Sequence, residues 1–176
     1  MTNAELAILS LVVEHPRYGY EIENVIETRG MREWTEIGFS SIYYLLRKLE
    51  RQGRIRAHLE PATGRGPARK VYEASPAGVD AFQAGVLEAL SMPRRAYPSL
   101  LLGLACLPGV PYGRAVGALR RYRDALAERL AHVGGRQAAQ RPLSYFVMAT
   151  FDYSLAMLRA ELAWIEGFIK HMEEIK

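Results

Sequence analysis

The sequence of 176 residues predicts a mainly α-helical protein: an N-terminal winged helix-turn-helix of three helices and a two-stranded wing, followed by a C-terminal α-helical dimerisation domain. Two observations support this prediction. Three segments with helical spacing of apolar residues precede two short segments of alternating polarity. A long 4-3 repeat of apolar residues then occupies the end of the chain. We place the two domains at residues 1–91 and 92–176, because Ser91-Met92-Pro93 interrupts the helical pattern.

The first two helices are expected at residues 3–14 and 18–28. The first has apolar residues at helical spacing and ends before Pro16, since a proline disfavours helical geometry in the residue that precedes it. The second has one apolar face and is followed by Gly30, a suitable residue for a C-terminal cap. A linker from Gly30 to Gly38 leads to the third helix.

The third helix is the clearest element of the sequence. Ser40 and Ser41 are good N-cap residues, and Gly53 ends the helix. Its apolar residues recur at i, i+3, i+4 and i+7: Ile42, Leu45, Leu46 and Leu49. The opposite face holds Ser40, Tyr44, Arg47 and Arg51, flanked by Tyr43 and Lys48. The pattern therefore predicts a helix with one buried face and one basic, polar face.

A hairpin of two strands is expected at residues 54–59 and 70–74. In the first strand the inward residues should be Ile55, Ala57 and Leu59, which alternate with polar ones. In the second they should be Tyr72 and Ala74. The segment from Pro61 to Pro67 is rich in turn residues and basic, so it should form the tip.

Four more helices should complete the chain, at residues 76–90, 99–107, 112–133 and 143–174. Ser75 should cap the first of them, and Gly134-Gly135 should end the third. The last helix carries a 4-3 repeat: Phe151, Leu155, Leu158, Leu162, Ile165, Ile169 and Met172. Three heptads indicate a packing seam, either within the chain or across a dimer. We expect this seam to form a homodimer interface.

Positive charge is concentrated where the third helix and the hairpin lie. The net charge is only +4, but eight basic residues stand against Glu50 and Glu60 in one short stretch: Arg47, Lys48, Arg51, Arg54, Arg56, Arg65, Arg69 and Lys70. A helix fits the major groove of DNA, and a basic hairpin can contact the adjacent backbone. The pattern therefore favours double-stranded DNA as the partner. The alternative is a protein–protein adaptor that does not bind DNA.

Four motifs resemble those of the PadR family of transcriptional regulators. They are PRYGYEI at residues 16–22, FSSIYYLLRKLERQG at 39–53, TGRGPARKVY at 63–72 and SPAG at 75–78. They follow one another in the order and at the spacing of the family, and they cover roughly residues 4–80. The resemblance implies a homodimeric repressor that binds an inverted-repeat operator and is released by a small molecule. Ala74 departs from the pattern, because a larger aliphatic residue is usual there.

The resemblance also implies roles for single residues. Tyr18 and Tyr20 would contact phosphates, and Tyr43 would support the third helix; a packing role for Tyr20 and Tyr43 is equally open. Trp164 and Phe168 would contact a small aromatic or lipophilic effector, although packing is the alternative for Trp164. With the basic face of the third helix, the expected DNA contacts are Tyr18, Tyr20, Ser40, Ser41, Tyr43, Tyr44, Arg47, Lys48, Arg51, Arg65, Arg69 and Lys70.

Other classes of protein find little support in the sequence. The four histidines have no metal-ligand spacing and no nucleophile motif is present, so we expect no enzyme, no metal and no cofactor. The longest apolar run, residues 100–107, is too short to span a bilayer, and the N-terminus does not resemble a signal peptide. The single cysteine, Cys106, is expected in the core and excludes an intrachain disulfide. A cytoplasmic location without membrane contact is therefore expected.

Overall fold

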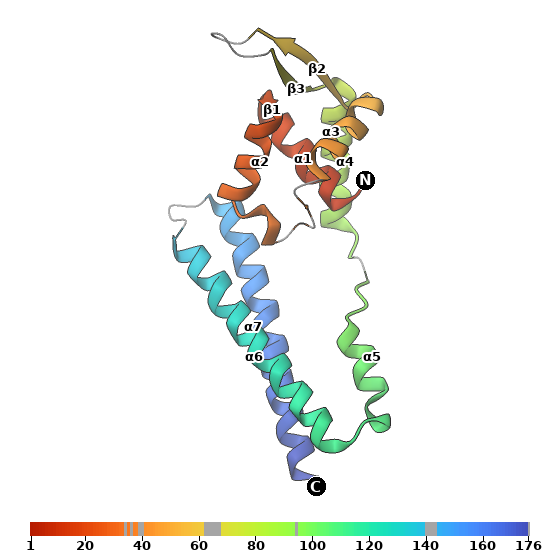
Figure 1. The fold of residues 1–176 in the computed structure, drawn as a ribbon, viewed down its shortest axis with the longest axis vertical. Helices are drawn as coiled ribbons and strands as arrows, with labels where there is room; N and C mark the ends of the chain where they lie inside the picture. Colours follow the sequence, from red (N-terminus) through yellow and green to blue (C-terminus); the bar gives the residue numbers. More distant parts are fainter. Residues whose placement is uncertain are drawn as a thin grey trace. The chain divides into compact units, whose positions relative to one another are not determined.

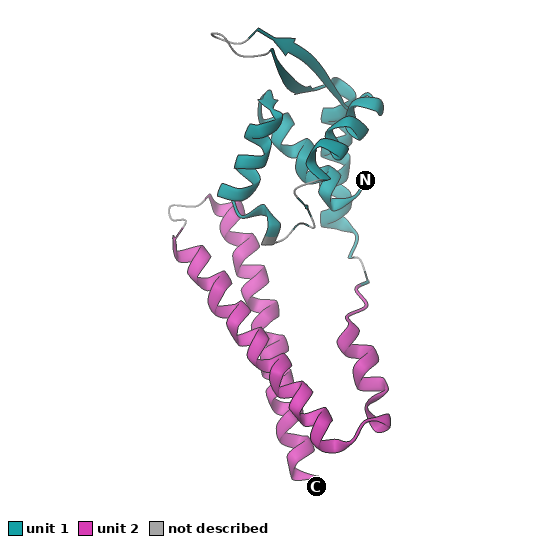
Figure 2. Ribbon diagram, viewed as in Figure 1, with its two compact units in different colours: residues 1–95 teal, residues 96–176 magenta. Residues whose placement is uncertain are grey.

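The computed structural model describes residues 1–33, 35, 37–38, 41–61, 68–93, 95–139 and 144–175. The chain divides into two compact units, residues 1–95 and 96–176 (Figure 2), against an expected boundary between residues 91 and 92. Both units are mainly helical, as predicted (Figure 1). Within the described ranges, no helix combines the length and the apolar character that crossing a membrane requires.

The first unit contains a helix-turn-helix and a small antiparallel sheet. Its elements are α1 (Asn3–Glu14), β1 (Arg17–Tyr18), α2 (Gly19–Thr28), the 3-10 helix η1 (Met31–Glu33), α3 (Ser41–Arg51), β2 (Ile55–Glu60), β3 (Arg69–Ala74) and α4 (Pro76–Ser91). β2 and β3 form the predicted hairpin, with Ala57 opposite Tyr72. The sequence did not predict β1, which pairs with the other edge of β3 and gives the order β1-β3-β2. Pro16 ends α1 and leaves two extended residues before α2 begins, so the wing sheet has three strands.

The core of the first unit lies between its helices and the base of the hairpin. The four predicted apolar residues of α3 are all buried, which confirms the orientation of that helix. Tyr72 is buried as predicted, and Ala74 packs against the same core. The prediction for Leu59 was wrong, because its side chain is 68% exposed. Of the three residues expected to point inward from this strand, Ile55 and Ala57 join the core of the unit and Leu59 does not.

The second unit contains α5 (Ser99–Ala105), the 3-10 helix η2 (Leu107–Gly109), α6 (Tyr112–Ala139) and α7 (Tyr145–Glu174). The 4-3 repeat of α7 packs within the chain: Ile165 and Ile169 form a cluster with Leu119 and Leu126 of α6. Leu158, Leu162 and Met172 pack against this cluster, as do two leucines of α5. The seam is therefore occupied by α6. Cys106 was expected in the core and is exposed instead.

The end of α6 also differs from the prediction. The helix passes through Gly134 and Gly135 and ends at Ala139, although each glycine costs about 1 kcal/mol relative to alanine in a helix. Contacts with α7 compensate for this cost. Val133 is buried, and the Gln137 side chain donates a hydrogen bond to Asp152 at 3.0 Å. Tertiary packing thus overrides the helix-ending tendency of the two glycines.

Candidate nucleic-acid interface

The outer face of α3 is polar and basic. Because its four apolar residues are buried, Tyr43, Tyr44, Arg47 and Arg51 remain exposed on the other side. Within the described part of the chain, neither arginine forms an ion pair with an acidic side chain. Ser41 is half-buried at the start of the helix, and its hydroxyl donates to the carbonyl of Gly38 at 2.6 Å. This face therefore offers two unneutralised guanidinium groups to a ligand.

Tyr43 connects α3 to the start of α2. A Cβ atom placed on Gly19 would lie only 2.8 Å from Cε1 of the Tyr43 ring, so a larger residue at position 19 would force this ring to move. The same ring is 46% exposed. The two roles left open by the sequence are therefore compatible: Tyr43 packs in the helix-turn-helix and also presents part of its ring to solvent.

An aromatic cluster joins the start of α2 to the wing. The rings of Tyr18 and Tyr20 stack with centroids 5.6 Å apart and an interplanar angle of 11°. The guanidinium of Arg69 lies 5.9 and 5.7 Å from these two centroids, and it donates to the Tyr20 hydroxyl at 3.4 Å. Tyr20 is 51% exposed. The cluster thus holds a wing arginine beside an accessible tyrosine, at the edge of the helix-turn-helix.

The Tyr18 hydroxyl already has a partner in the wing. It donates a hydrogen bond of 2.7 Å to Glu60, and this bond raises the pKa of Tyr18. The same bond, together with His58 at 3.3 Å, holds the pKa of Glu60 below its usual value. Tyr18 therefore ties β1 to β2 through its hydroxyl.

Both lysines of the predicted contact set form ion pairs with glutamates. Nζ of Lys48 lies 2.6 Å from Oε1 of Glu5 in α1, whose side chain is only 4% exposed. Nζ of Lys70 lies 2.9 Å from Oε2 of Glu50 in α3. The described basic residues of this face therefore divide into arginines of α3 without an acidic partner and lysines that are already neutralised.

A network around Ser75 closes the base of the wing. The Ser75 amide donates to the carbonyl of Arg54 at 3.0 Å, and its hydroxyl donates to the carbonyl of Gly53 at 2.6 Å. The same hydroxyl accepts a bond from the Gly78 amide, which confirms the predicted N-cap of α4. Gly53 has φ of +69°, the left-handed conformation that glycine adopts without strain. The end of α3, the end of β3 and the start of α4 are therefore fixed together.

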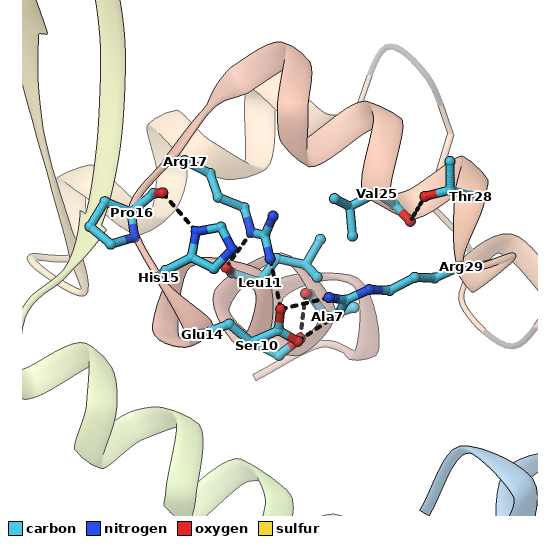
Figure 3. Close-up of polar contacts among 10 residues, drawn as sticks. All are labelled: Ala7, Ser10, Leu11, Glu14, His15, Pro16, Arg17, Val25, Thr28 and Arg29. Carbon is cyan, nitrogen blue, oxygen red and sulfur yellow. Dashed lines mark hydrogen bonds and ion pairs between the residues drawn. The ribbon is translucent and has the colours of Figure 1, made fainter. Parts of the chain in front are cut away.

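Glu14 lies in a second network, between the ends of α1 and α2 (Figure 3). Arg17 is 6% exposed; its Nε donates to the carbonyl of Leu11 at 2.8 Å and its Nη2 to Glu14 at 2.7 Å. Arg29, at the end of α2, reaches the same carboxylate with bonds of 2.6 and 3.0 Å. Sequence reasoning missed this network. Glu14 and Arg17 are three residues apart, a spacing that predicts an ion pair only within a helix, and the helix ends before Pro16.

α7 carries a second apolar stripe, which sequence reasoning also missed. Its members are at least half-exposed: Phe146 (79%), Tyr153 (71%), Met157 (55%), Trp164 (50%) and, directly after the helix, Ile175 (69%). They are 7, 4, 7 and 11 residues apart, so at about 100° per residue they lie within about 40° of one another, on a different face of the helix from the seam. Trp164 stacks on Phe168, with ring centroids 5.1 Å apart and planes at 10°. The outward face of α7 is therefore aromatic and accessible.

Two predicted DNA contacts, Ser40 and Arg65, lie outside the described residues, as does most of the wing tip. The others fall into three groups: the exposed face of α3, the aromatic cluster with Arg69, and the two paired lysines. Among the residues that the structure describes, no group of His, Cys, Asp and Glu side chains is arranged to hold a metal ion.

Residues 8–84 match the model of the Transcriptional regulator PadR-like family. Bacillus subtilis PadR in complex with operator DNA is 17% identical, with a TM-score of 0.77 over 96% of this chain and 98% of that one. The PadR-like transcriptional regulator BC1756 from Bacillus cereus is 16% identical, with a TM-score of 0.72 over 99% of this chain and 100% of that one. Bacillus subtilis PadR in complex with p-coumaric acid is 17% identical, with a TM-score of 0.77 over 96% of this chain and 98% of that one.

At these identities the solved structures show a common fold, which extends over both units of the chain. No curated protein matches the sequence. The matched residues 8–84 include the helix-turn-helix, the wing and the first part of α4, where the sequence motifs lie. The similarity to the Transcriptional regulator PadR-like family therefore lies in the N-terminal unit, over residues 8–84.

Proposed function

We propose that the protein is a homodimeric transcriptional repressor that binds an inverted-repeat operator through α3 and the wing. The observation that supports this most directly is the pair of exposed arginines on α3, Arg47 and Arg51, which have no acidic partner in the described part of the chain. A helix of this kind inserts into the major groove, where arginine reads guanine and neutralises phosphates. The solved complex of Bacillus subtilis PadR with operator DNA has the same fold and supports this mode of binding.

The contacts divide by chemistry. Tyr44 and Arg47 lie on the exposed face of α3, so we assign them to base edges. Ser41 at the start of that helix favours a phosphate, because free backbone amides and the helix dipole attract anions there. The DNA backbone would be contacted by Arg51, near the end of α3, and by Tyr20 and Arg69 of the aromatic cluster. Arg65, which lies outside the described residues, belongs to the same proposed set because of its charge.

The test is a salt titration with DNA that the protein itself selects from a randomised duplex pool. Several phosphate contacts per chain predict a log–log slope on the order of −5 to −10 for a dimer. Arg47→Ala should cost roughly 1–3 kcal/mol of binding free energy and relax the base preference at one position. Arg159→Ala, an exposed arginine of α7, is the matched control and should change neither quantity. A flat salt response with wild-type protein would favour the adaptor.

The dimer should form through the outward stripe of α7. The seam first expected there, from Phe151 to Met172, packs against α6, so its buried members have little surface left for a second chain. Five large apolar side chains with half or more of their surface exposed form a patch of the kind that protein contacts cover. Because they lie along one face of α7, they suit packing against a second copy of the same helix. Two-fold symmetry would then present two copies of α3 to two half-sites.

Release by a small aromatic molecule is the last part of the proposal. Trp164 is half-exposed and its ring is parallel to that of the partly buried Phe168, so it offers an aromatic surface on which a planar ligand can stack. Because these rings belong to the proposed contact between copies, a ligand there would alter the separation of the two DNA-binding units. The structure of Bacillus subtilis PadR with p-coumaric acid supports this class of ligand.

Fluorescence can test the effector directly. A phenolic acid should quench wild-type tryptophan emission and release the selected DNA over the same concentration range. Trp164→Phe should keep DNA binding and lose most of the quenching, since Trp34 is the other tryptophan of the chain. Quenching without release would show binding that has no regulatory role.

A further inference from the structure

We infer that Lys48 and Lys70 are positioning residues, which hold α3 between α1 and the wing, whereas the phosphate contacts on this face come from arginines. The inference rests on the proposed DNA binding and assigns a different role to two residues that sequence reasoning placed among the DNA contacts. Each lysine is paired with a glutamate from another element: Lys48 of α3 with Glu5 of α1, and Lys70 of β3 with Glu50 of α3.

The pair of Lys48 and Glu5 is the more tightly held of the two. The Glu5 side chain is 4% exposed, and its Oε2 accepts a hydrogen bond of 2.8 Å from the Thr2 amide in the capping box of α1. Burial by itself raises the pKa of Glu5, but the Lys48 ammonium and the bonds with Thr2 outweigh it and hold the pKa below its usual value. The glutamate therefore stays ionised, and Lys48 is its one cationic partner in the described part of the chain.

If Lys48 left Glu5 to contact a phosphate, a buried carboxylate would lose its cation. Removing one partner from a buried ion pair is costly, because the remaining charge is uncompensated. The polyanion would then also lie close to that free carboxylate. The energetics therefore favour a Lys48 that keeps its partner when DNA binds.

Lys70 and Glu50 form the second pair, on the other side of the helix. Nζ and Oε2 are 2.9 Å apart, and the ammonium also lies 5.3 Å from the centroid of the Tyr72 ring. Tyr72 is buried in the core of the unit. The lysine is thus held by a carboxylate of α3 and by an aromatic ring of its own strand. This pair is more exposed than the first, at 42% and 34% for the two side chains, so its hold is weaker.

The geometry of α3 places its arginines between the two pairs. Successive residues of an α-helix are about 100° apart around the axis. Relative to Arg47, Arg51 therefore lies at about 40°, Lys48 at about 100° and Glu50 at about −60°. The two ion pairs flank the arginine face on opposite sides, one toward α1 and the other toward the wing. Together they fix the rotation of α3 about its own axis, which decides where Arg47 and Arg51 point.

Counterion release distinguishes positioning from contact. A lysine that neutralises a phosphate contributes about 0.9 to the log–log salt slope per contact, whereas a lysine already paired with a glutamate contributes little. The experiment compares Lys48→Met and Lys70→Met with Arg51→Met, which removes a proposed phosphate contact, in the full-length protein. Two probes are used: the duplex selected by wild-type protein from a random pool, and a scrambled duplex of the same length.

Arg51→Met should reduce the salt slope by about 0.9 for each phosphate that is no longer neutralised, and so by about twice that for a dimer. Lys48→Met should leave the slope unchanged and reduce the preference for the selected duplex over the scrambled one several-fold. Lys70→Met should do the same to a smaller extent. Salt slopes for the lysine variants that fall as far as the slope for Arg51→Met would overturn the inference.

Glu5→Gln should change DNA binding in opposite directions according to whether Lys48 positions α3 or contacts a phosphate. If Lys48 positions α3, removing its partner should lower the preference for the selected duplex, although the lysine is still present. If Lys48 contacts a phosphate, the freed lysine should bind DNA equally well or more tightly. Circular dichroism checks that the variant is folded, and Glu50→Gln at the more exposed pair repeats the test if it is not. Absence of salt-dependent DNA binding in the wild-type protein would instead contradict the proposed function.

Discussion

Glu14 receives both Arg17 and Arg29, which reach it from two different elements and close the space between the end of α1 and the end of α2. The hydrogen bonds from Arg29 are the main cause of its low pKa, and Arg17 adds to them. Arg17 is buried, so it needs this carboxylate as its counter-charge. A single acidic side chain thus stabilises the framework that carries the helix-turn-helix.

The lowered pKa makes this contribution dependent on pH. The pKa of Glu14 is below its unfolded value of about 4.3, so the stabilisation is fully present above that pH and is lost as the pH falls through the folded pKa. We expect Glu14→Gln to reduce the free energy of unfolding by roughly 1–2 kcal/mol at pH 7, a range that allows for the partial exposure of Glu14. The difference from wild type should shrink as the pH falls through the folded pKa of Glu14, which urea unfolding at several acidic pH values can measure.

Glu23→Gln in α2 is the control for this measurement, because Glu23 has no ion pair within the described ranges. Its stability should follow that of wild type at every pH. A Glu14→Gln defect of constant size from pH 7 to pH 3 would mean that the carboxylate acts through packing and not through its charge.

Predictions for single residues were correct where the exposure of a side chain depends on its position around one helix. The exposed positions of Tyr44, Arg47 and Arg51 follow from helical spacing alone. Lys48 meets its partner because α3 packs beside α1, and Lys70 meets its partner because β3 lies near α3. A local sequence pattern does not predict these contacts between elements. The prediction for Leu59 failed for a related reason, since alternation indicates which face a residue occupies but not whether anything covers that face.

At the scale of elements, the start of α4 packs against the turn between α3 and β2 with no space to spare. A Cβ atom on Gly78 would lie 1.9 Å from the carbonyl oxygen of Arg54, and this oxygen also accepts the bond from the Ser75 amide. Backbone cannot give way as a flexible side chain can. The glycine therefore permits the contact through which α4 closes the wing.

Gly78→Ala should consequently destabilise the protein by roughly 2–4 kcal/mol, because the added methyl group forces the helix away from the turn. Gly134→Ala is the matched control: the glycine lies inside α6 and a Cβ there meets nothing within 4 Å among the described residues. That variant should be as stable as wild type or up to about 1 kcal/mol more stable. Thermal unfolding of both variants measures the contrast, and equal effects would refute the packing explanation.

Side-chain hydrogen bonds join α6 to α7 in addition to their apolar seam. Tyr122 donates to Glu161 at 2.6 Å, and this bond raises the pKa of Tyr122 to about 12. Tyr112 donates to the carbonyl of Met172 at 2.9 Å, and Gln137 makes its bond to α7 near the other end of α6. Bonds spaced along the whole length of the two helices prevent them from sliding past each other.

The helices themselves were largely predictable from periodicity, while their ends were less so. α3 agrees closely with the sequence prediction in its apolar spacing and in its end before Gly53. The strand β1 could not be predicted, because two residues carry no pattern and its formation depends on the free edge of β3. The continuation of α6 past its two glycines was missed because the compensating contacts come from α7, whose position beside α6 is a tertiary property.

At the scale of the whole molecule, substitutions in the two apolar stripes of α7 should have different effects: one should prevent dimerisation, and the other should unfold the second unit. We expect Tyr153→Glu to produce a monomer that keeps near-native helicity, because the side chain is 71% exposed and its replacement disturbs no core. DNA affinity should fall about 100-fold or more, since a monomer loses the second half-site. Light scattering and circular dichroism measure the two properties.

Two controls complete this comparison. Arg159→Glu changes charge on α7 away from both stripes and should leave a dimer. Ile165→Glu introduces a charge into the seam, where the native side chain is fully buried, and should unfold the second unit. A Tyr153→Glu protein that remains dimeric would place the interface elsewhere, and the exposed leucines of α5 would be the next candidates.

The candidate site as a whole was predictable in outline. The excess of positive charge and the order of the elements are enough to indicate α3 and the hairpin. The 4-3 repeat likewise predicts a packing seam on α7, but it does not decide which helix fills that seam. Which helix packs against the seam depends on the position of α6 beside α7. The second stripe becomes the candidate for a contact between copies only because α6 already covers the seam.

The order of the strands also protects the wing from aggregation. A hairpin that extends beyond its helices exposes backbone donors and acceptors along its edges, and such edges recruit strands from other chains. β1 covers part of one edge of β3, so β2 forms the main free edge. That strand carries Arg56, His58 and Glu60 in alternation and is followed by Pro61. Charges and a proline of this kind discourage intermolecular sheet growth, so the wing can project from the fold without becoming a template for fibrils.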